Sequence, residues 1–271
     1  MITLKTALES IVNTFNDYSV DEAEFKALCM VCEAAGIKNS EFKMYSEREI
    51  DEKLLSEPVT RVLSGEPLQY VLGKWDFYES EFFVGDGVLI PRPETEELVE
   101  LAINEAEKIE NPIIYDLCSG SGCIGISVAK KVSKATVYCV EKSEEAFYYL
   151  EKNAKGINNI KLILADINDV PELPKADIII SNPPYIKTED IKSLDKELSF
   201  EPKMALDGGS DGLDFYRIIR DKYLNTLNKN GLLLLEIGNE QGGDIKTLFE
   251  NAMIIKDIYG NDRIAKIQYK G

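Results

Sequence analysis

From about residue 91 onward, short apolar segments alternate with longer helix-like ones, and this alternation restricts the fold more than any other feature. The strand candidates are rich in aliphatic and β-branched residues and lie at 113–117, 135–140, 161–164, 177–180 and 231–237. Segments such as 124–132 and 144–154 have the apolar spacing of helices. Apolar strands that alternate with helices are typical of a mostly parallel sheet covered on both faces. The sequence therefore predicts an α/β, Rossmann-like doubly wound domain over 91–271, with ligands at the carboxyl ends of its strands.

The first 70 residues have a different pattern, with apolar side chains such as Leu4, Leu8 and Ile11 at helical spacing. This pattern predicts a small N-terminal helical bundle over 1–70, and Gly36 is expected to end its second helix. The pattern supports at most a role in substrate docking or simple scaffolding. The stretch that begins at Tyr70-Val71 is aromatic and alternating, which predicts a β-hairpin linker over 71–90.

The charge and the missing residue types exclude several kinds of function. The chain carries 31 Lys and Arg against 48 Asp and Glu, a net charge of −17. Tight nucleic-acid binding needs cationic side chains that displace phosphate counterions, so no stable nucleic-acid complex is expected. An acidic surface suits a basic protein partner. Because the sequence contains 0 His, Ser-His and Cys-His nucleophilic pairs and His-ligated metals are excluded.

The five cysteines indicate neither a disulfide framework nor a metal site in a chain of this size. Cys29 and Cys32 form a C-x-x-C pair, but no second pair completes a zinc set, so we assign both to a helix. No apolar run approaches the roughly 20 residues of a membrane span, and residues 1–5 lead into polar, helix-like sequence without a signal-peptide core. The expected location is the cytoplasm, without membrane contact.

A glycine-rich turn follows the first predicted strand, as Asp116-Leu117-Cys118-Ser119-Gly120-Ser121-Gly122. Glycines allow close approach of backbone to a ligand, and the following helix begins with unpaired N–H groups. The turn lacks the Lys-Ser/Thr ending of a phosphate loop, so ATP hydrolysis is not indicated. Alone, such a turn suits any nucleotide cofactor or a mere tight turn.

Glu141 follows the second predicted strand, about 20 residues beyond the glycines, where an acid accepts hydrogen bonds from the ribose hydroxyls of an adenosine cofactor. NAD and S-adenosylmethionine both remain possible at this point.

The segment Asn182-Pro183-Pro184-Tyr185 follows a buried strand and decides between these cofactors. An amide or aromatic amine nitrogen is a poor nucleophile because its lone pair is delocalised. The Asn182 side-chain oxygen and the Pro183 carbonyl can accept hydrogen bonds from its N–H groups, and prolines add no competing donors. The Tyr185 ring can stack on a flat acceptor group. The segment therefore predicts an S-adenosylmethionine-dependent N-methyltransferase with Asn182, Pro183 and Tyr185 as catalytic residues and Pro184 beside them in the substrate site.

In these motifs and several others the sequence resembles the release factor glutamine N5-methyltransferases, which methylate the Gln of the Gly-Gly-Gln loop in peptide chain release factors. The further matching segments are 65–73 (GEPLQYVLG), 88–96 (VLIPRPETE), 201–213, 235–238 (LEIG) and 260–263 (GNDR). The resemblance implies that the cofactor is lined by Cys118 to Gly122, Glu141, Asp166, Ile167 and Asn182, with Asp166 near the adenine. It also implies that Asn182 and Tyr185 hold the glutamine, and that Arg92 and Glu94 lie near the pocket.

Two other classes of function remain open. The first is an adenine-N6 methyltransferase of nucleic acid, because the same Asn-Pro-Pro-Tyr chemistry serves an exocyclic amine on a flipped base. The second is a non-catalytic protein that only binds the cofactor. The acidic balance argues against the first, and the intact segment from Asn182 to Tyr185 argues against the second.

Overall fold

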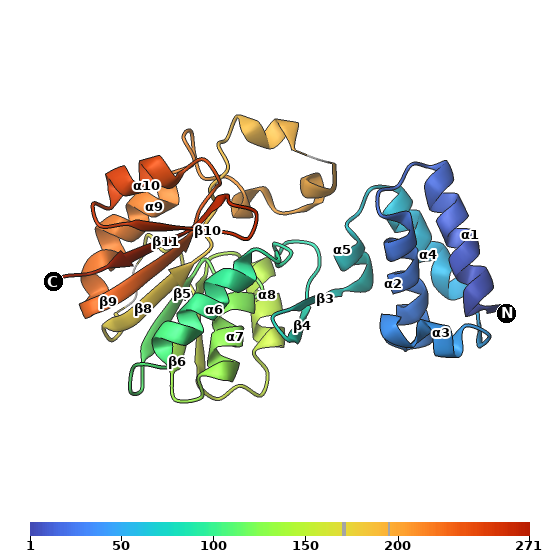
Figure 1. Cartoon of the computed structure of the whole chain (residues 1–271), viewed down its shortest axis with the longest axis horizontal. Helices are drawn as coiled ribbons and strands as arrows, with labels where there is room; N and C mark the ends of the chain where they lie inside the picture. Colours follow the sequence, from blue (N-terminus) through green and yellow to red (C-terminus); the bar gives the residue numbers. More distant parts are fainter. Residues whose placement is uncertain (170–171, 195) are drawn as a thin grey trace. The chain divides into compact units, whose positions relative to one another are not determined.

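The computed structural model describes residues 1–169, 172–194 and 196–271, which form two compact units (Figure 1). The first unit contains Met1–Lys74 together with Lys196–Phe200, and the second contains Trp75–Asp195 and Glu201–Gly271. The segment 196–200 therefore belongs to the helical unit although it lies far along the chain from the rest of it. Among the described residues, no helix is both long and apolar enough to cross a membrane.

The first unit is helical. Its helices are α1 (Leu4–Asp17), α2 (Ala23–Ala35), α3 (Phe42–Tyr45), α4 (Lys53–Leu63) and α5 (Leu68–Leu72), with short strands β1 (Ile2–Thr3) and β2 (Glu49–Ile50). The apolar side of α1 is buried at Leu4, Ala7, Ile11 and Phe15, as the helical spacing predicts. Gly36 ends α2, and both Cys29 and Cys32 are buried in that helix.

A buried cation ties segment 196–200 to this unit. The side chain of Lys26 on α2 is 8% exposed, and its Nζ lies 2.5 Å from Oε1 of Glu197. The 3-10 helix η3 (Lys196–Phe200) supplies Glu197. A buried ammonium requires such a partner because its desolvation is costly, so this ion pair links η3 to α2.

The expectation of extended structure at Tyr70 and Val71 is wrong. Both residues lie in α5, where their N–H groups donate to the Pro67 carbonyl at 3.0 and 3.1 Å. Pro67 precedes the helix, a position that a residue without an N–H favours. The hairpin itself is present but shorter, with β3 (Lys74–Phe77) and β4 (Ser80–Phe83) forming a two-stranded sheet.

The second unit contains a seven-stranded sheet with the order β10-β11-β9-β8-β5-β6-β7. Its strands are β5 (Ile113–Leu117), β6 (Thr136–Glu141), β7 (Ile160–Leu164), β8 (Ala176–Ser181), β9 (Leu227–Glu236), β10 (Met253–Lys256) and β11 (Asp262–Gln268). The five strands from β5 to β9 pair parallel with one another, whereas β11 pairs antiparallel with β9 and β10. The predicted α/β, mostly parallel sheet is confirmed.

Helices cover both faces of this sheet. They are α6 (Thr95–Ala106), α7 (Cys123–Lys131) and α8 (Glu144–Asn153) on one face, and α9 (Asp214–Ile218) and α10 (Gly242–Leu248) on the other (Figure 1). Successive strand residues point to opposite faces. Ile114 of β5 accordingly packs with Leu98 of α6, and its neighbour Tyr115 belongs to the core around Tyr216 of α9. The strands are buried on both faces, which explains their continuous apolar sequences.

Candidate active site

The glycine-rich turn follows β5 and packs against buried side chains. Asp116 is fully buried, and its Oδ2 accepts a hydrogen bond from the Gly125 N–H at 2.9 Å. Burial raises the pKa of Asp116 to about 7. Gly122 has a φ of +81°, and a Cβ there would lie 2.4 Å from Cδ1 of Leu150. A side chain at Gly122 is therefore excluded both by the backbone conformation and by the packing of α8.

Glu141 is the last residue of β6 and is held by three backbone donors. Its Oε2 accepts from the Gly120 N–H at 2.8 Å, and its Oε1 accepts from the N–H groups of Lys142 and Ser143 at 2.8 and 2.7 Å. An ionised carboxylate has about four acceptor sites. The three bonds leave Oε2 able to accept one further donor, from a ligand in the cavity.

Asp166 follows β7 and lies opposite Lys142. The Nζ of Lys142 is 2.7 Å from Oδ2 of Asp166, and Oδ1 accepts from the Asn168 N–H at 2.8 Å. Burial alone would raise the pKa of Asp166, but the hydrogen bonds from Lys142 and Asn168 outweigh it and lower the pKa. Asp166 is therefore an anion at neutral pH with a fixed orientation.

Asn182 stands at the carboxyl end of β8. The preceding Ser181 donates its hydroxyl to the Leu117 carbonyl at 2.6 Å, which fixes this strand end against β5. The Asn182 Nδ2 lies 3.3 Å from Oγ1 of Thr95, the first residue of α6. Pro183 and Pro184 are both buried.

Tyr185 is half-buried, and its backbone is anchored by hydrogen bonds from one amide side chain. The Nε2 of Gln241 donates to the carbonyls of Tyr185 and Gly212, each at 3.1 Å. Burial raises the pKa of Tyr185 to about 12, so its phenol stays protonated at physiological pH. Gln241, which directly precedes α10, thus holds the loop after β8.

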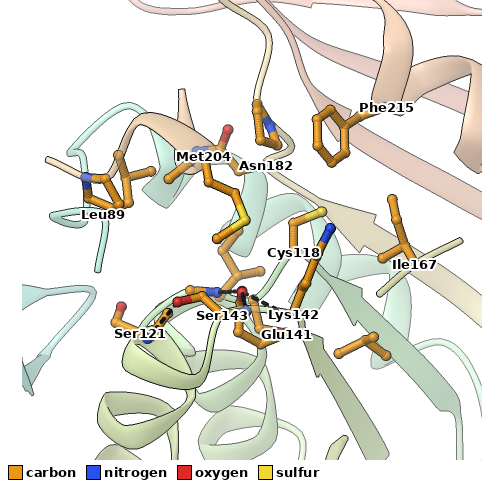
Figure 2. A pocket seen from close by; sticks show the side chains of 18 of the residues that line it. Leu89, Cys118, Ser121, Glu141, Lys142, Ser143, Ile167, Asn182, Met204 and Phe215 are labelled. Atoms are coloured by element: carbon orange, nitrogen blue, oxygen red, sulfur yellow. Dashed lines mark hydrogen bonds between the residues drawn. The ribbon is translucent and has the colours of Figure 1, made fainter. Parts of the chain in front are cut away.

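One cavity of the second unit brings most of the predicted residues together (Figure 2). The predicted residues that line it are Arg92, Cys118, Ser119, Gly120, Ser121, Glu141, Asp166, Ile167, Asn182 and Pro184. In Figure 2, Asn182 and Phe215 lie at one side of the cavity, and Glu141 and Ser143 at the other. Among the described residues, Glu94, Gly122, Pro183 and Tyr185 are not part of its lining.

The cavity wall also contains residues that sequence reasoning missed. Its apolar side chains include Leu89, Met204, Phe215 and Ile218. Thr95 lines it as well, from the first position of α6. No local pattern identifies these residues, because they come from loops and helices whose positions depend on the tertiary fold.

Arg92 pairs with a buried acid at the edge of the cavity. Its guanidinium forms an ion pair with Glu201, and the other oxygen of that carboxylate accepts from the Ile90 N–H at 3.1 Å. Glu201 is 6% exposed. The segment before α6 is thus attached to the loop that begins at residue 201, and both segments contribute to the wall.

Two family models match the chain. The model described as the PrmC N-terminal domain matches residues 6–73, and the one described as the methyltransferase small domain matches residues 98–209. The chain is 37% identical over 276 residues to the release factor glutamine methyltransferase of Thermodesulfovibrio yellowstonii, which covers 96% of each chain. It is 40% identical to that of Flavobacterium psychrophilum, which covers 75% of this chain and 76% of the relative.

A solved structure shares the fold of the second unit. The 16S rRNA N2 G1207 methyltransferase of Thermus thermophilus superposes with a TM-score of 0.51 at 16% identity, over 73% of this chain and 50% of that one. A likeness at this identity shows the fold alone.

Proposed function

Because this chain belongs to the release factor glutamine methyltransferase family, we propose that it transfers a methyl group from S-adenosylmethionine to the side-chain nitrogen of the glutamine in the Gly-Gly-Gln motif of peptide chain release factors. The observation that carries the proposal is the position of Asn182 at the end of β8, in the same cavity as Glu141 and Asp166. The proposed acceptor-binding residue and the proposed cofactor-binding residues therefore line the same cavity.

The residues present fit the proposed cofactor. Glu141 retains an acceptor for a ribose hydroxyl, and Asp166 offers a fixed carboxylate for the adenine side of the cavity. Apolar side chains, among them Ile167 and Phe215, suit the flat base. Two carboxylates near the cavity also favour a cationic sulfonium. When bound, the cofactor supplies an electrophilic methyl group.

The protein's part in the reaction is to orient and polarise the acceptor amide. Asn182 Oδ1 and the Pro183 carbonyl are the proposed acceptors for its two N–H bonds. Hydrogen bonds there localise the nitrogen lone pair and align it with the electrophilic carbon, which is catalysis by positioning. The proton lost from the nitrogen passes to a carbonyl acceptor or to water. This step does not require an imidazole base, and the sequence contains 0 His.

The helical unit is proposed to dock the release factor. The family model for this region matches residues 6–73, nearly the whole N-terminal segment. The adenine-N6 alternative is not favoured. The relative that covers 96% of this chain is named a release factor glutamine methyltransferase, and the net charge of −17 does not suit nucleic-acid binding.

The test measures transfer of a labelled methyl group to purified release factor. The acceptors are the intact factor and one with Gly-Gly-Gln changed to Gly-Gly-Ala, and the enzymes are wild type, Asn182→Ala and a control, Asn228→Ala. Asn228 pairs with Asp177 near the start of β8, remote along the strands from Asn182. Labelling should require both the glutamine and Asn182, with a fall in kcat of about 100-fold or more in Asn182→Ala. Labelling of the Gly-Gly-Ala factor by the wild type would refute the proposed acceptor.

A further inference from the structure

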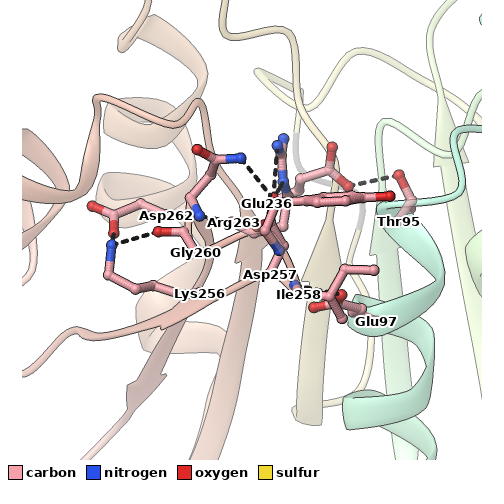
Figure 3. Close-up of polar contacts among 11 residues, drawn as sticks. Thr95, Glu97, Glu236, Lys256, Asp257, Ile258, Gly260, Asp262 and Arg263 are labelled. Carbon is pink, nitrogen blue, oxygen red and sulfur yellow. Dashed lines mark hydrogen bonds and ion pairs between the residues drawn. The ribbon is translucent and has the colours of Figure 1, made fainter.

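The acid that ends β9 has no role in the mechanism above. Glu236 is 1% exposed, and its Oε2 lies 2.6 Å from Oγ1 of Thr95 (Figure 3). Thr95, itself 2% exposed, is also the residue to which Asn182 donates at 3.3 Å. The three side chains therefore form one chain of hydrogen bonds that runs from the buried acid to the cavity.

The pairing of the strands explains why these residues meet. Ser181 of β8 is the partner of Leu235 in the neighbouring parallel strand β9. The next residues, Asn182 and Glu236, therefore leave the two strands at the same level and on the same face of the sheet. The first turn of α6 covers that face and places Thr95 between them. The Tyr216 hydroxyl, 2.9 Å from the Glu236 carbonyl, holds the end of β9.

The direction of the hydrogen bonds follows from the number of protons available. An ionised carboxylate can only accept, so Thr95 must donate its single hydroxyl proton to Glu236. The Thr95 oxygen can then only accept from Asn182, which therefore presents its NH₂ group to Thr95. The other polar atom of the amide, Oδ1, becomes the acceptor available to a ligand in the cavity.

From this arrangement we infer that Thr95 and Glu236 are positioning residues, which hold the Asn182 amide with its oxygen toward the substrate nitrogen. The inference rests on the proposed function for the identity of that substrate. A flipped Asn182 amide would present NH₂ to the N–H groups of a glutamine, donor against donor. The relay thus selects the one orientation in which Asn182 can accept.

Protonation of Glu236 would remove this selection, because a carboxylic acid can donate to Thr95 and permit the reverse direction. Burial raises the pKa of Glu236 to about 7, although the hydrogen bond from Thr95 and the charge of Arg263 on β11 both lower it. Glu94 raises this pKa further and Arg92 lowers it, and both precede α6. The phenol of Tyr185, after β8, also faces the acid. In the wild type, kcat should therefore fall as pH decreases below about 7.

The experiment compares Thr95→Val, Thr95→Ser and Glu236→Gln with the wild type in the full-length protein. Thr136→Val and Asp177→Asn are matched controls at the opposite end of the sheet. For each, kcat, KM for release factor, the Kd of S-adenosylmethionine and Tm are measured. We expect Thr95→Val to lower kcat about 10- to 100-fold with the cofactor Kd unchanged. Thr95→Ser should restore kcat to within about threefold of the wild type, since it keeps the hydroxyl.

Glu236→Gln tests the direction of the relay, because a glutamine can donate as well as accept. Glu236→Gln should lower kcat and abolish the acidic limb of the pH profile, which is the fall in kcat at low pH. A Thr95→Val enzyme with wild-type kcat, or a Glu236→Gln enzyme with an unchanged acidic limb, would overturn the inference. A change in Tm alone, with kcat preserved, would assign the two residues a purely structural role.

A second readout keeps this test independent of the proposed function. The ¹H–¹⁵N resonances of the Asn182 side-chain amide, assigned by their loss in Asn182→Asp, report its hydrogen bond directly. Their hydrogen exchange should be slow in the wild type and Thr95→Ser, and fast in Thr95→Val. Should the wild type fail to methylate release factor, the proposed function fails, yet this pattern would still support the relay. Equal exchange in Thr95→Val and the wild type would refute the relay whatever the substrate.

Discussion

The backbone N–H of Gly120 lies 2.8 Å from Oε2 of Glu141, so the glycine-rich turn after β5 and the acid that ends β6 are in direct contact. The two sequence signals for an adenosine cofactor are thus parts of one structure. Glu141 holds the turn in addition to its proposed role as a ribose acceptor. Substitution of Glu141 should therefore weaken cofactor binding more than the loss of one ligand contact would.

Glu141→Ala is expected to raise the Kd of S-adenosylmethionine about 10- to 100-fold, measured by isothermal titration calorimetry. The change removes a proposed ribose acceptor and leaves the N–H groups of Gly120, Lys142 and Ser143 without their partner. Glu144→Ala, three residues later and exposed at the start of α8, is the control and should bind normally. Equal affinities in the two variants would contradict the assignment of Glu141.

Gly125→Ala is expected to destabilise the protein by about 1–3 kcal/mol, because the site has no space for a methyl group. A Cβ at Gly125 would lie 2.5 Å from Sγ of Cys139 and 2.8 Å from Oδ2 of Asp116. Gly243→Ala is the matched control, since a Cβ there meets nothing within 4 Å and the residue lies in α10. It should stabilise by up to about 1 kcal/mol. Urea unfolding measures both, and equal effects would contradict the packing argument.

The stability of the wild type should depend on pH through Glu236. Its pKa is 4.5 as an ordinary Glu and is raised to about 7 by burial in the folded state. The folded protein therefore keeps a proton that the unfolded chain has lost, and the contribution is fully present below pH 4.5. It is lost as pH rises through about 7.

Chemical denaturation at several values between pH 5 and pH 8 can isolate this contribution. The free energy of unfolding should fall by about 2 kcal/mol more in the wild type than in Glu236→Gln. Asp116, whose pKa burial also raises to about 7, acts equally in both proteins and cancels in the difference. Parallel pH profiles for the two proteins would show that Glu236 stays ionised in the fold.

The affinity for release factor should decrease with salt if the acidic surface of this chain docks a basic partner. The net charge of −17 motivates the expectation. Since the screening length falls from about 8 Å at 0.15 M to about 3 Å at 1 M salt, KM for the factor should rise severalfold. The Kd of the cofactor, measured in the same buffers, serves as the control. A KM that does not respond to salt would contradict electrostatic docking.

Much of the sheet could be predicted because its strands are apolar on both faces. The predicted segment 113–117 coincides with β5, and 177–180 lies within β8. The strand β10 was not predicted from its pattern, because Met253–Lys256 is a short, partly exposed edge strand without a buried face. Tyr70 and Val71 were assigned to the wrong element because aromatic and β-branched residues favour strands, while Pro67 and the surrounding helices favour α5.

For the candidate site too, some residues could be predicted from the sequence and others could not. Glu141 and Asn182 could be located because Glu141 ends β6 and Asn182 directly follows β8, where the carboxyl ends of a parallel sheet converge. The contact of Thr95 with Glu236 could not, since these residues are 141 positions apart and meet only because β9 lies beside β8. Strand order is a property of the assembled sheet and leaves no local signal in either segment.

The distances along the chain between Asn182, Thr95 and Glu236 also bear on when activity arises during synthesis. Thr95 emerges from the ribosome 87 residues before Asn182 and 141 residues before Glu236. The strand β9 that delivers Glu236 pairs on its other side with β11, which is made later still. Contacts of such long sequence separation form late in folding. If the proposed relay holds, a nascent chain therefore contains all its cofactor loops before it contains the acid that orients Asn182.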